Sequence, residues 1–302
     1  MHLISRAALF RFSCLGVVAC LASGLAWQES RATEPTPRPA DGLVANGTYT
    51  NKYFDLSYPL PSDGKEGLAG PRPSRFGHYV LSTLESTGDY SWMILITAQD
   101  TFFGSKTSND APAMVRDLGS SLSEIDGMTI DRPPSEVTIA GRRFSRIDFS
   151  GVGLFSSTLV TDIRCHLVSF NLTANNPDLL AALVLSLNNL GAARAAVSGD
   201  LDPVCMKNRA DTRNVVARVD PPAIAPFAPI PVRVVIGADG GVKHVNVIRA
   251  TDDQSNAIET ALGKWKFRTS ETIASGADIE TGLVIEFTHE GHVRYSAGDR
   301  MQ

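Results

Sequence analysis

Alternating apolar and polar positions form the most specific pattern of the chain, near its C-terminal end. Two alternating runs, Val232–Ile236 and Val242–Ile248, flank a glycine-rich segment, which predicts two strands joined by a tight turn. A helix follows, because Thr251 and Gln254 have the spacing of a capping box. Ile279–Phe287 supplies a third strand. We therefore predict a small ββαβ unit whose antiparallel sheet packs one face on the helix and leaves the other face solvated.

The predicted helix carries an apolar stripe that would lie on the hairpin. The stripe repeats at helical spacing and consists of Ala257, Ile258, Ala261, Leu262 and Trp265. Trp265 and Phe267 have two interpretations, because large aromatic side chains serve either as core or as a contact surface for a partner. We interpret both as core residues that fill the seam between helix and sheet.

This region resembles the C-terminal domain of TonB-family energy transducers. The residues that carry the resemblance are Asp239, Gly240, Val242, Ala261, Leu262, Trp265 and Phe267. The chain departs from the family pattern where Asp220-Pro221-Pro222 replaces a Tyr-Pro and where Arg268-Thr269 replaces a proline. The resemblance covers residues 219–288 and implies a domain that binds a partner by pairing at the edge of its sheet.

A longer pattern of strands and helices precedes this unit. The predicted strands are Tyr49–Tyr58, His78–Leu84, Trp92–Thr97, Glu136–Ala140, Arg143–Phe149, Ser156–Thr161 and Arg164–Thr173. Asp110 is a cap for a helix over Ala111–Ile125, and Asn176 is a cap for a second helix that ends at Gly191. The result is an α+β domain in which helices cover an antiparallel sheet. Its order of elements and its opening, Tyr49 to Pro59, are similar to the PsbP-like fold.

The N-terminus has the layout of a secretory signal. Two arginines precede the uncharged run Phe12–Trp27, which predicts a signal peptide over residues 1–28, with cleavage after Ala26 or Ala32. An uncleaved membrane anchor and a lipoprotein leader that carries its lipid on Cys20 are the alternatives. All three export the rest of the chain, so we expect a periplasmic protein or, in the alternatives, an anchored one.

Stretches rich in proline or polar residues separate the predicted units. Residues 29–45 form a Pro-containing linker, residues 46–198 the α+β domain, and residues 199–231 a linker whose end is Pro-rich. The TonB-like domain covers residues 232–290, and residues 291–302 form a polar tail. We expect the two domains to be separate units.

The composition excludes some classes of function. Hydrophobic residues make up 43% of the chain, which is enough for true cores. Acidic residues outnumber Lys and Arg by 32 to 28, and no basic block occurs, so the chain is unsuited to nucleic acid.

Four cysteines divide into two groups. Cys14 and Cys20 belong to the leader, which leaves Cys165 and Cys205. In an oxidising compartment these two are expected to form a disulfide. Two separate buried thiols are the alternative.

Three short motifs carry candidate chemistry. Ser62 and Lys65 match Ser-x-x-Lys, but the neighbouring proline and glycine predict a loop instead of a helix. His289 and His292 are three residues apart after a strand, which predicts a polar segment instead of a zinc site. His166 follows Cys165 on a predicted strand, so the two would face opposite sides. We predict no catalytic residue, cofactor or metal.

These observations favour an exported protein-interaction protein without enzymatic activity. Its partner would be an unidentified envelope protein or peptide strand, and homodimerisation by edge pairing stays open. Contact with a membrane is expected only if the N-terminal segment is retained. One alternative is a membrane-anchored energy transducer of the TonB type. The other is a periplasmic enzyme or small-ligand carrier that uses a pocket in residues 46–198.

Overall fold

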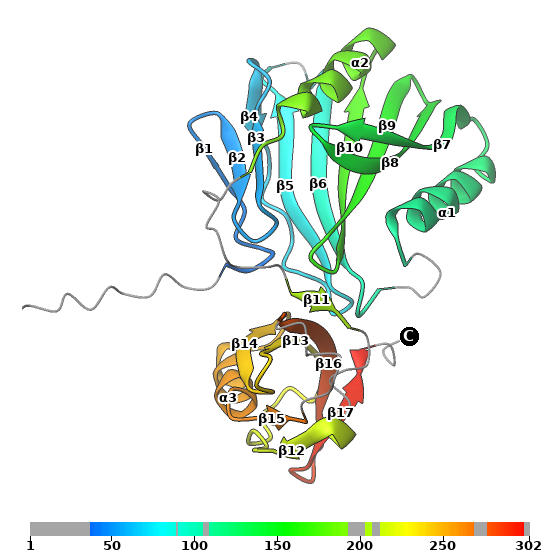
Figure 1. Ribbon diagram of the computed structural model, residues 1–302. Helices are drawn as coiled ribbons and strands as arrows, with labels where there is room; N and C mark the ends of the chain where they lie inside the picture. Colours follow the sequence, from blue (N-terminus) through cyan, green and yellow to red (C-terminus); the bar gives the residue numbers. More distant parts are fainter. Residues whose placement is uncertain are drawn as a thin grey trace, which may run out of the picture. The chain divides into compact units, whose positions relative to one another are not determined.

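The first part of the chain forms a seven-stranded antiparallel sheet (Figure 1). In order across the sheet, its strands are β4 (Gly64–Glu66), β5 (His78–Ser86), β6 (Trp92–Asp100), β10 (His166–Ala174), β9 (Leu154–Ile163), β8 (Arg142–Gly151) and β7 (Thr129–Ile139). The structure is a computed structural model that describes residues 37–88, 90–104, 109–192, 203–206, 212–268 and 277–298. The predicted leader over residues 1–28 lies outside these ranges.

A three-stranded sheet and two helices complete this part of the fold. The sheet consists of β1 (Leu43–Ala45), β2 (Thr48–Asn51) and β3 (Leu56–Pro59). The helices are α1 (Ala111–Ser123) and α2 (Pro177–Ser186), and α2 continues into the 3-10 turn η1 (Leu187–Asn189). Both predicted caps are confirmed, because the side chain of Asp110 accepts from the amide of Ala113 and that of Asn176 from the amide of Leu179.

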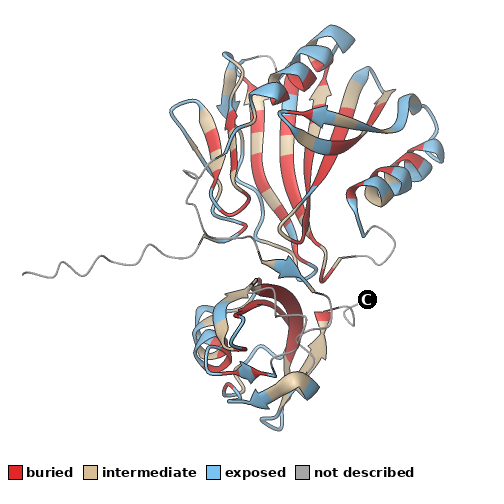
Figure 2. Cartoon of the chain, in the orientation of Figure 1, coloured by how far each residue is buried: buried red, intermediate tan, exposed pale blue. Residues whose placement is uncertain are grey.

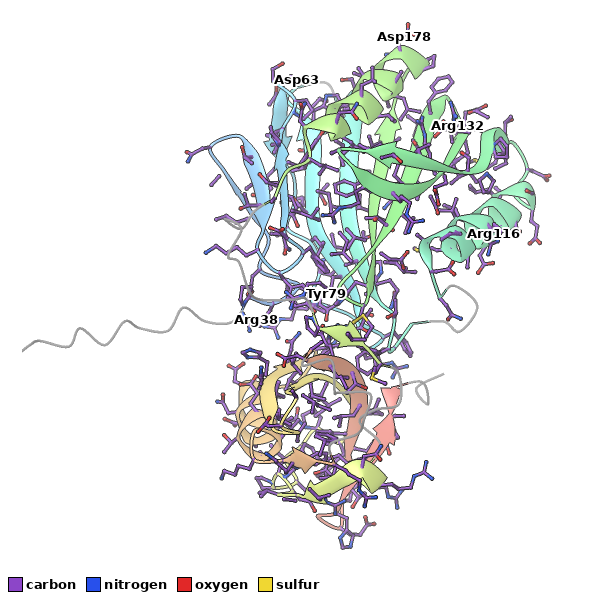
Figure 3. All side chains as sticks on the ribbon, viewed as in Figure 1. Arg38, Asp63, Tyr79, Arg116, Arg132 and Asp178 are labelled. Carbon is purple, nitrogen blue, oxygen red and sulfur yellow. A yellow bond between two sulfur atoms is a disulfide. The ribbon has the colours of Figure 1, made fainter. Side chains whose placement is uncertain are left out.

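The two faces of the seven-stranded sheet bury different partners. On β9, Val160 belongs to a cluster with Val115 of α1, whereas its neighbour Leu159 belongs to the main core with Leu183 of α2. Figure 2 shows buried residues running along β5, β6 and β10. The opposite sides of the helices are exposed, as Figure 3 shows for Arg116 on α1 and Asp178 on α2.

The C-terminal part forms a second sheet. Its order is β11 (Val204–Cys205), β16 (Ile279–Phe287), β13 (Ile230–Ile236) and β14 (Val242–Val247), and β17 (Val293–Ala297) also pairs with β16. Helix α3 (Asp252–Leu262) follows β14, and the capping box between Thr251 and Gln254 is present as predicted. Beside it, β12 (Val215–Ala217), preceded by the 3-10 turn η2 (Thr212–Asn214), pairs with β15 (Lys266–Phe267).

The prediction that this sheet is solvated on one face is wrong. Every residue of β13 is buried, and so is nearly all of β16. One face of the sheet packs on α3, whereas on the other face Gly282 lies so close to Phe102 that an added Cβ would come within 2.6 Å of it. The predicted pattern missed this second face because its residues, Arg233 and Glu280 among them, are not all apolar.

Several predicted connections also contain strands. The tail over residues 291–302 includes β17, the linker over 199–231 includes β11 and β12, and the linker over 29–45 includes β1. These strands are too short to stand out by periodicity.

Contacts group Thr36–Gln302 into one compact unit, where the sequence predicts two separate units. The fold is mixed α+β, with more sheet than helix. Among the described residues, no helix has both the length and the apolar character needed to cross a membrane.

Candidate functional site

The candidate site includes β14, which is an edge strand of the C-terminal sheet. β14 pairs with β13 alone, and no described strand pairs with it on the other side. The opposite edge of the sheet is different, because β16 pairs with β11 at Ile279 and Glu280 and with β17 from Leu283 to Phe287. An unpaired strand edge is a template for an incoming strand.

The register identifies which backbone groups of β14 are free. The amide of Ile248 donates to the carbonyl of Pro231 at 3.0 Å, so this pair occupies a hydrogen-bonded position of the ladder. In an antiparallel pair, bonded and non-bonded positions alternate, so the backbone groups of Val245 and Val247 point away from β13. No described residue bonds to them there. The edge therefore presents donors and acceptors in the spacing that another strand requires.

The TonB-like motif residues surround the turn that precedes β14. Gly240 has a φ of +81°, and its carbonyl accepts from the amide of Phe267 at 2.8 Å. Asp239 is exposed and pairs with Lys266 at 2.9 Å, and this pairing lowers the pKa of the Asp239 carboxyl. Val242 then begins β14. The turn and β15 thus hold the start of the edge strand.

The remaining motif residues form the core under α3. Ala261 and Leu262 of the helix are buried together with Trp265 and Phe267. The indole N–H of Trp265 donates to the carbonyl of Val219 at 2.8 Å, which satisfies its one polar group. Each buried aromatic side chain contributes roughly 2 to 3 kcal/mol to stability.

A cleft of about 770 Å³ opens at the far end of β14. It takes residues from three segments: the loop before β5, the proline-rich run before β13, and the connection from β14 to α3. Its lining consists of Arg72, Pro73, Ser74, Arg75, Phe76, Pro226, Ala228, Pro229, Ile230, Val247, Ile248, Arg249, Ala250, Thr251, Gln254 and Ser255. The proline-rich run, predicted as the end of a linker, is therefore a wall of the cleft.

The loop wall is fixed by its own hydrogen bonds. The hydroxyl of Ser74 accepts from the amides of Phe76 and His78, and the side chain of Gln99 donates to the carbonyl of Phe76 at 2.8 Å. Gly77, at a φ of +70°, ends the turn. These hydrogen bonds tie the loop to β5 and β6.

The proline wall is fixed by Gln254. Its buried side-chain amide donates to the carbonyls of Ile224 and Pro226, each at 2.8 Å, and its oxygen accepts from the amide of Thr251. A single side chain thus caps α3 and holds the proline-rich run against it.

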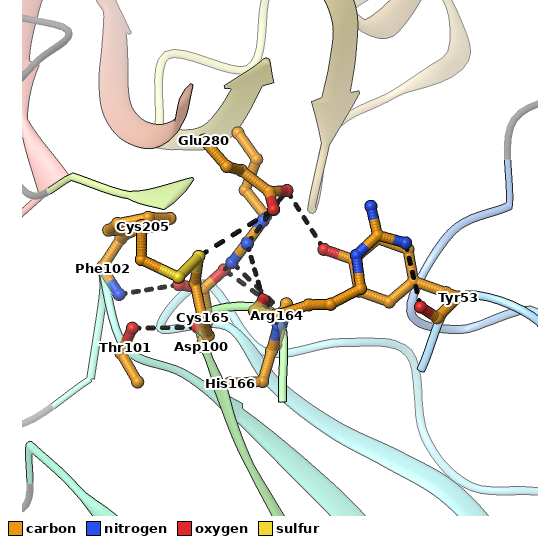
Figure 4. The surroundings of a disulfide bond; sticks show 10 residues. Tyr53, Asp100, Thr101, Phe102, Arg164, Cys165, His166, Cys205 and Glu280 are labelled. Atoms are coloured by element: carbon orange, nitrogen blue, oxygen red, sulfur yellow. Dashed lines mark hydrogen bonds and ion pairs between the residues drawn. A yellow bond between two sulfur atoms is a disulfide. The ribbon is translucent and has the colours of Figure 1, made fainter. Parts of the chain in front are cut away.

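A buried cluster of charges links β13 and β16 to the seven-stranded sheet (Figure 4). Arg233 forms ion pairs with Asp100 and Glu280, and all three side chains are at most 4% exposed. The hydroxyl of Tyr53 donates to Glu280 at 3.1 Å. Burial opposes the charge of Arg233, but the two carboxylates raise its pKa well above the usual value, so the arginine stays protonated. The cluster is closed to solvent and positions the strands.

A strained turn between β9 and β10 organises this cluster. Arg164 and Cys165 form a two-residue loop with φ values of 46° and 60°, the geometry of a type I′ hairpin. The carbonyl of Arg164 accepts from Arg233. The guanidinium of Arg164 lies 4.4 Å from the ring centre of Tyr53. Cys165 forms the predicted disulfide with Cys205, which fastens β11 here. Because Cys165 lies in the turn, the prediction that it shares a strand with His166 is wrong.

His166 is buried and neutral. Its Nδ1 lies 2.7 Å from the carbonyl of Arg164 and its Nε2 lies 3.3 Å from Arg233, so Nδ1 carries the proton and Nε2 accepts. Burial, reinforced by Arg233, holds the pKa of His166 well below its usual value of 6.5.

The two remaining candidate motifs, Ser62 with Lys65 and His289 with His292, lie on turns and a strand and not on a helix. Ser62 lies in a turn and Lys65 on β4, where it pairs with Glu85 at 3.1 Å. His289 lies in the turn after β16, with its ring 4.3 Å from that of Phe227. His292 ends the same turn. Within the described part of the chain, no group of three His, Cys, Asp or Glu is arranged to hold a metal ion.

Comparison with known proteins gives weak likenesses. Cyanobacterial PsbP (CyanoP) from Synechocystis sp. PCC 6803, solved in solution, is similar with a TM-score of 0.34 and 11% sequence identity, over 48% of this chain and 91% of that chain. A crystal structure from Bacteroides thetaiotaomicron VPI-5482 is similar with a TM-score of 0.28 and 18% identity, over 50% of each chain. No protein-family model and no curated protein match the chain. Nothing in these comparisons shows a TonB domain, which remains a prediction.

Sequence reasoning missed the cleft and the buried cluster. Arg233 stands alone among valines, and a lone charge in an apolar strand is a signal for a buried partner. Its partner Asp100, however, lies 133 residues away, and no spacing rule connects them. Arg72 and Arg75 share the loop before β5, and Arg249 comes from the connection between β14 and α3, so no local pattern joins all three.

Proposed function

We propose that this chain is an exported, periplasmic protein of the cell envelope that binds a protein partner through the edge of a TonB-like C-terminal domain. The observation that supports the proposal is the outer side of β14, which no described strand pairs with and where Val245 and Val247 direct backbone groups away from the sheet. In this proposal the chain acts by binding and needs no cofactor. The seven-stranded sheet and its helices would dock a second partner or a ligand.

Edge pairing has the strength expected of a specific but reversible contact. Each backbone hydrogen bond contributes about 0.5 to 1.5 kcal/mol net. A segment paired along the six residues of β14 would form a few such bonds. Side chains beside the strand then select the partner. The partially buried valines of β14 are already packed on the core, which keeps the edge in place.

The proposal is tested by crosslinking in cells. A photoreactive residue is placed at exposed position 244 on β14, in the full-length chain, with a second one at exposed position 116 on α1 as the control. The proposal predicts an adduct from position 244 that disappears with Val245→Pro, which removes the outward N–H, and persists with Val245→Thr, which keeps it. An adduct that survives Val245→Pro, or adducts from position 116 alone, would contradict it.

The identity of the adduct separates two kinds of edge pairing. A different envelope protein in the adduct identifies the partner. A second copy of this chain in the adduct identifies homodimerisation through the same edge. A membrane-anchored energy transducer is one of the two alternative functions. It requires a retained N-terminal segment, which N-terminal sequencing of the protein from envelope fractions would detect.

A further inference from the structure

The cleft continues the free edge of β14. Val247 is the last residue of the strand, its backbone points away from β13, and the same residue lines the cleft. An extended segment paired along β14 would therefore run into the cleft at this end. The chemistry of the cleft then bears on which segment fits.

The cleft carries positive charge without its own counter-charge. Arg72, Arg75 and Arg249 line it, all three are exposed, and none pairs with a carboxylate among the described residues. The chain as a whole has a net charge of −4, so this grouping is not a general property of its surface. Asp252 and Asp253 begin α3 nearby but do not line the cleft.

The floor of the cleft is apolar and held in place. Pro229, Ile230 and Val247 contribute to it, and Phe76 is 39% exposed beneath the guanidinium of Arg75, which lies 4.9 Å from its ring centre. An exposed aromatic ring under an arginine suits a ligand with both an apolar body and a negative group. The hydrogen bonds of Ser74 and Gln254 fix the walls, so little ordering is needed on binding.

We propose that the cleft binds the carboxylate side chains of an acidic, extended peptide segment whose backbone pairs with β14. This inference rests on the proposed edge pairing and adds the chemical class of the partner. Three arginines without a carboxylate partner in the described part of the chain favour an acidic segment over a neutral or basic one by charge complementarity.

The test uses synthetic peptides and fluorescence anisotropy with the disulfide-bonded chain. The probe is an extended peptide of about ten residues, with alternating valine and threonine and with aspartates at both ends, so that either strand direction brings a carboxylate to the cleft. The matched peptide carries asparagine at those positions. We expect the acidic peptide to bind roughly tenfold more tightly than its matched peptide, and to lose most of that advantage in high salt.

Variants separate the cleft from the edge. The double variant Arg72→Gln, Arg249→Gln should remove the preference for aspartate, whereas Arg116→Gln on α1 should leave it unchanged. All three positions are exposed, so we expect these variants to fold. Equal binding of both peptides would overturn this inference while leaving edge pairing intact. Acidic binding that is insensitive to Val245→Pro would instead overturn edge pairing, and with it this inference. Binding to anionic phosphatidylglycerol vesicles in place of the peptide would overturn it as well.

Discussion

Arg233 on β13 and Asp100 on β6 form an ion pair in which neither side chain is more than 1% exposed. Charges at such depth lose their hydration, and only their mutual contact and further hydrogen bonds compensate for the loss. Glu280, Phe102 and the carbonyl of Arg164 supply these further contacts. The edge strand β14 pairs with β13. The ion pair between Arg233 and Asp100 therefore helps to hold the proposed binding edge in place.

Removal of Arg233 should destabilise the protein strongly. Arg233→Met leaves the carboxylates of Asp100 and Glu280 buried without their cation, and we expect a loss of about 3 to 5 kcal/mol in the free energy of unfolding. Urea unfolding followed by circular dichroism measures this. Adding Asp100→Asn should recover part of the loss, because one uncompensated charge is then gone. A double variant less stable than Arg233→Met would contradict this explanation.

Stability should fall as the pH drops below 6.5. The folded state keeps His166 neutral because burial and Arg233 hold its pKa well below that value, whereas the unfolded chain takes up a proton there. We expect a loss of about 1.4 kcal/mol per pH unit over the window in which only the unfolded state is protonated. Urea unfolding at pH 7 and at about pH 5.5 measures it.

His166→Gln is the control for this pH dependence. It removes the titrating group and should flatten the change over the same window. Asp100 acts in the opposite direction, because burial raises its pKa and the folded state then binds a proton before the unfolded state does. A pH profile identical in the two proteins would exclude His166 as the cause.

The disulfide should stabilise the chain by about 4 kcal/mol, because it closes a separation of 40 residues in the unfolded state. The double variant Cys165→Ser, Cys205→Ser tests this by urea unfolding. Hydrogen exchange adds a local readout, since the amides of Val204 and Met206 donate to the carbonyls of Asp278 and Glu280 only while β11 is in place. Unchanged protection of both amides would show that β11 does not depend on the disulfide.

Periodicity predicted the elements of this fold but not how they join. The helices and their caps at Asp110, Asn176 and Thr251 follow from local hydrogen-bonding chemistry, and the structure confirms them. The disulfide followed from the count of cysteines that remain outside the predicted leader. The run predicted as one strand over Tyr49–Tyr58 forms two, β2 and β3, because a turn interrupts the alternation.

The parts of the site that the sequence could not predict depend on distant contacts. A sheet with a second buried face is invisible to a pattern in which that face carries Arg233, Glu280 and Gly282 instead of valines. The wall of the cleft is formed by prolines that Gln254 holds in place, and nothing in a proline-rich run shows whether it is held or free. Strand order predicts which strands lie at the edge of a sheet, but it does not predict whether another part of the chain covers that edge.

Gln254 should prove essential for the cleft wall. Gln254→Ala leaves the carbonyls of Ile224 and Pro226 without their donor and removes half of the capping box, and we expect a loss of about 1 to 3 kcal/mol in stability. Ser255→Ala, at the next position, should change stability by no more than about 0.5 kcal/mol. Thermal unfolding compares the two. Equal effects would mean that the hydrogen bonds of Gln254 do not fix the wall.

Hydrogen exchange at β14 tests edge pairing most directly. The segment identified by crosslinking at position 244 is made as a peptide, and exchange is measured for the amides of Val245 and Val247 with and without it. Both amides point away from β13, so the account predicts that they become protected only when the peptide is bound. Unchanged exchange at both amides under saturating peptide would contradict strand addition at this edge.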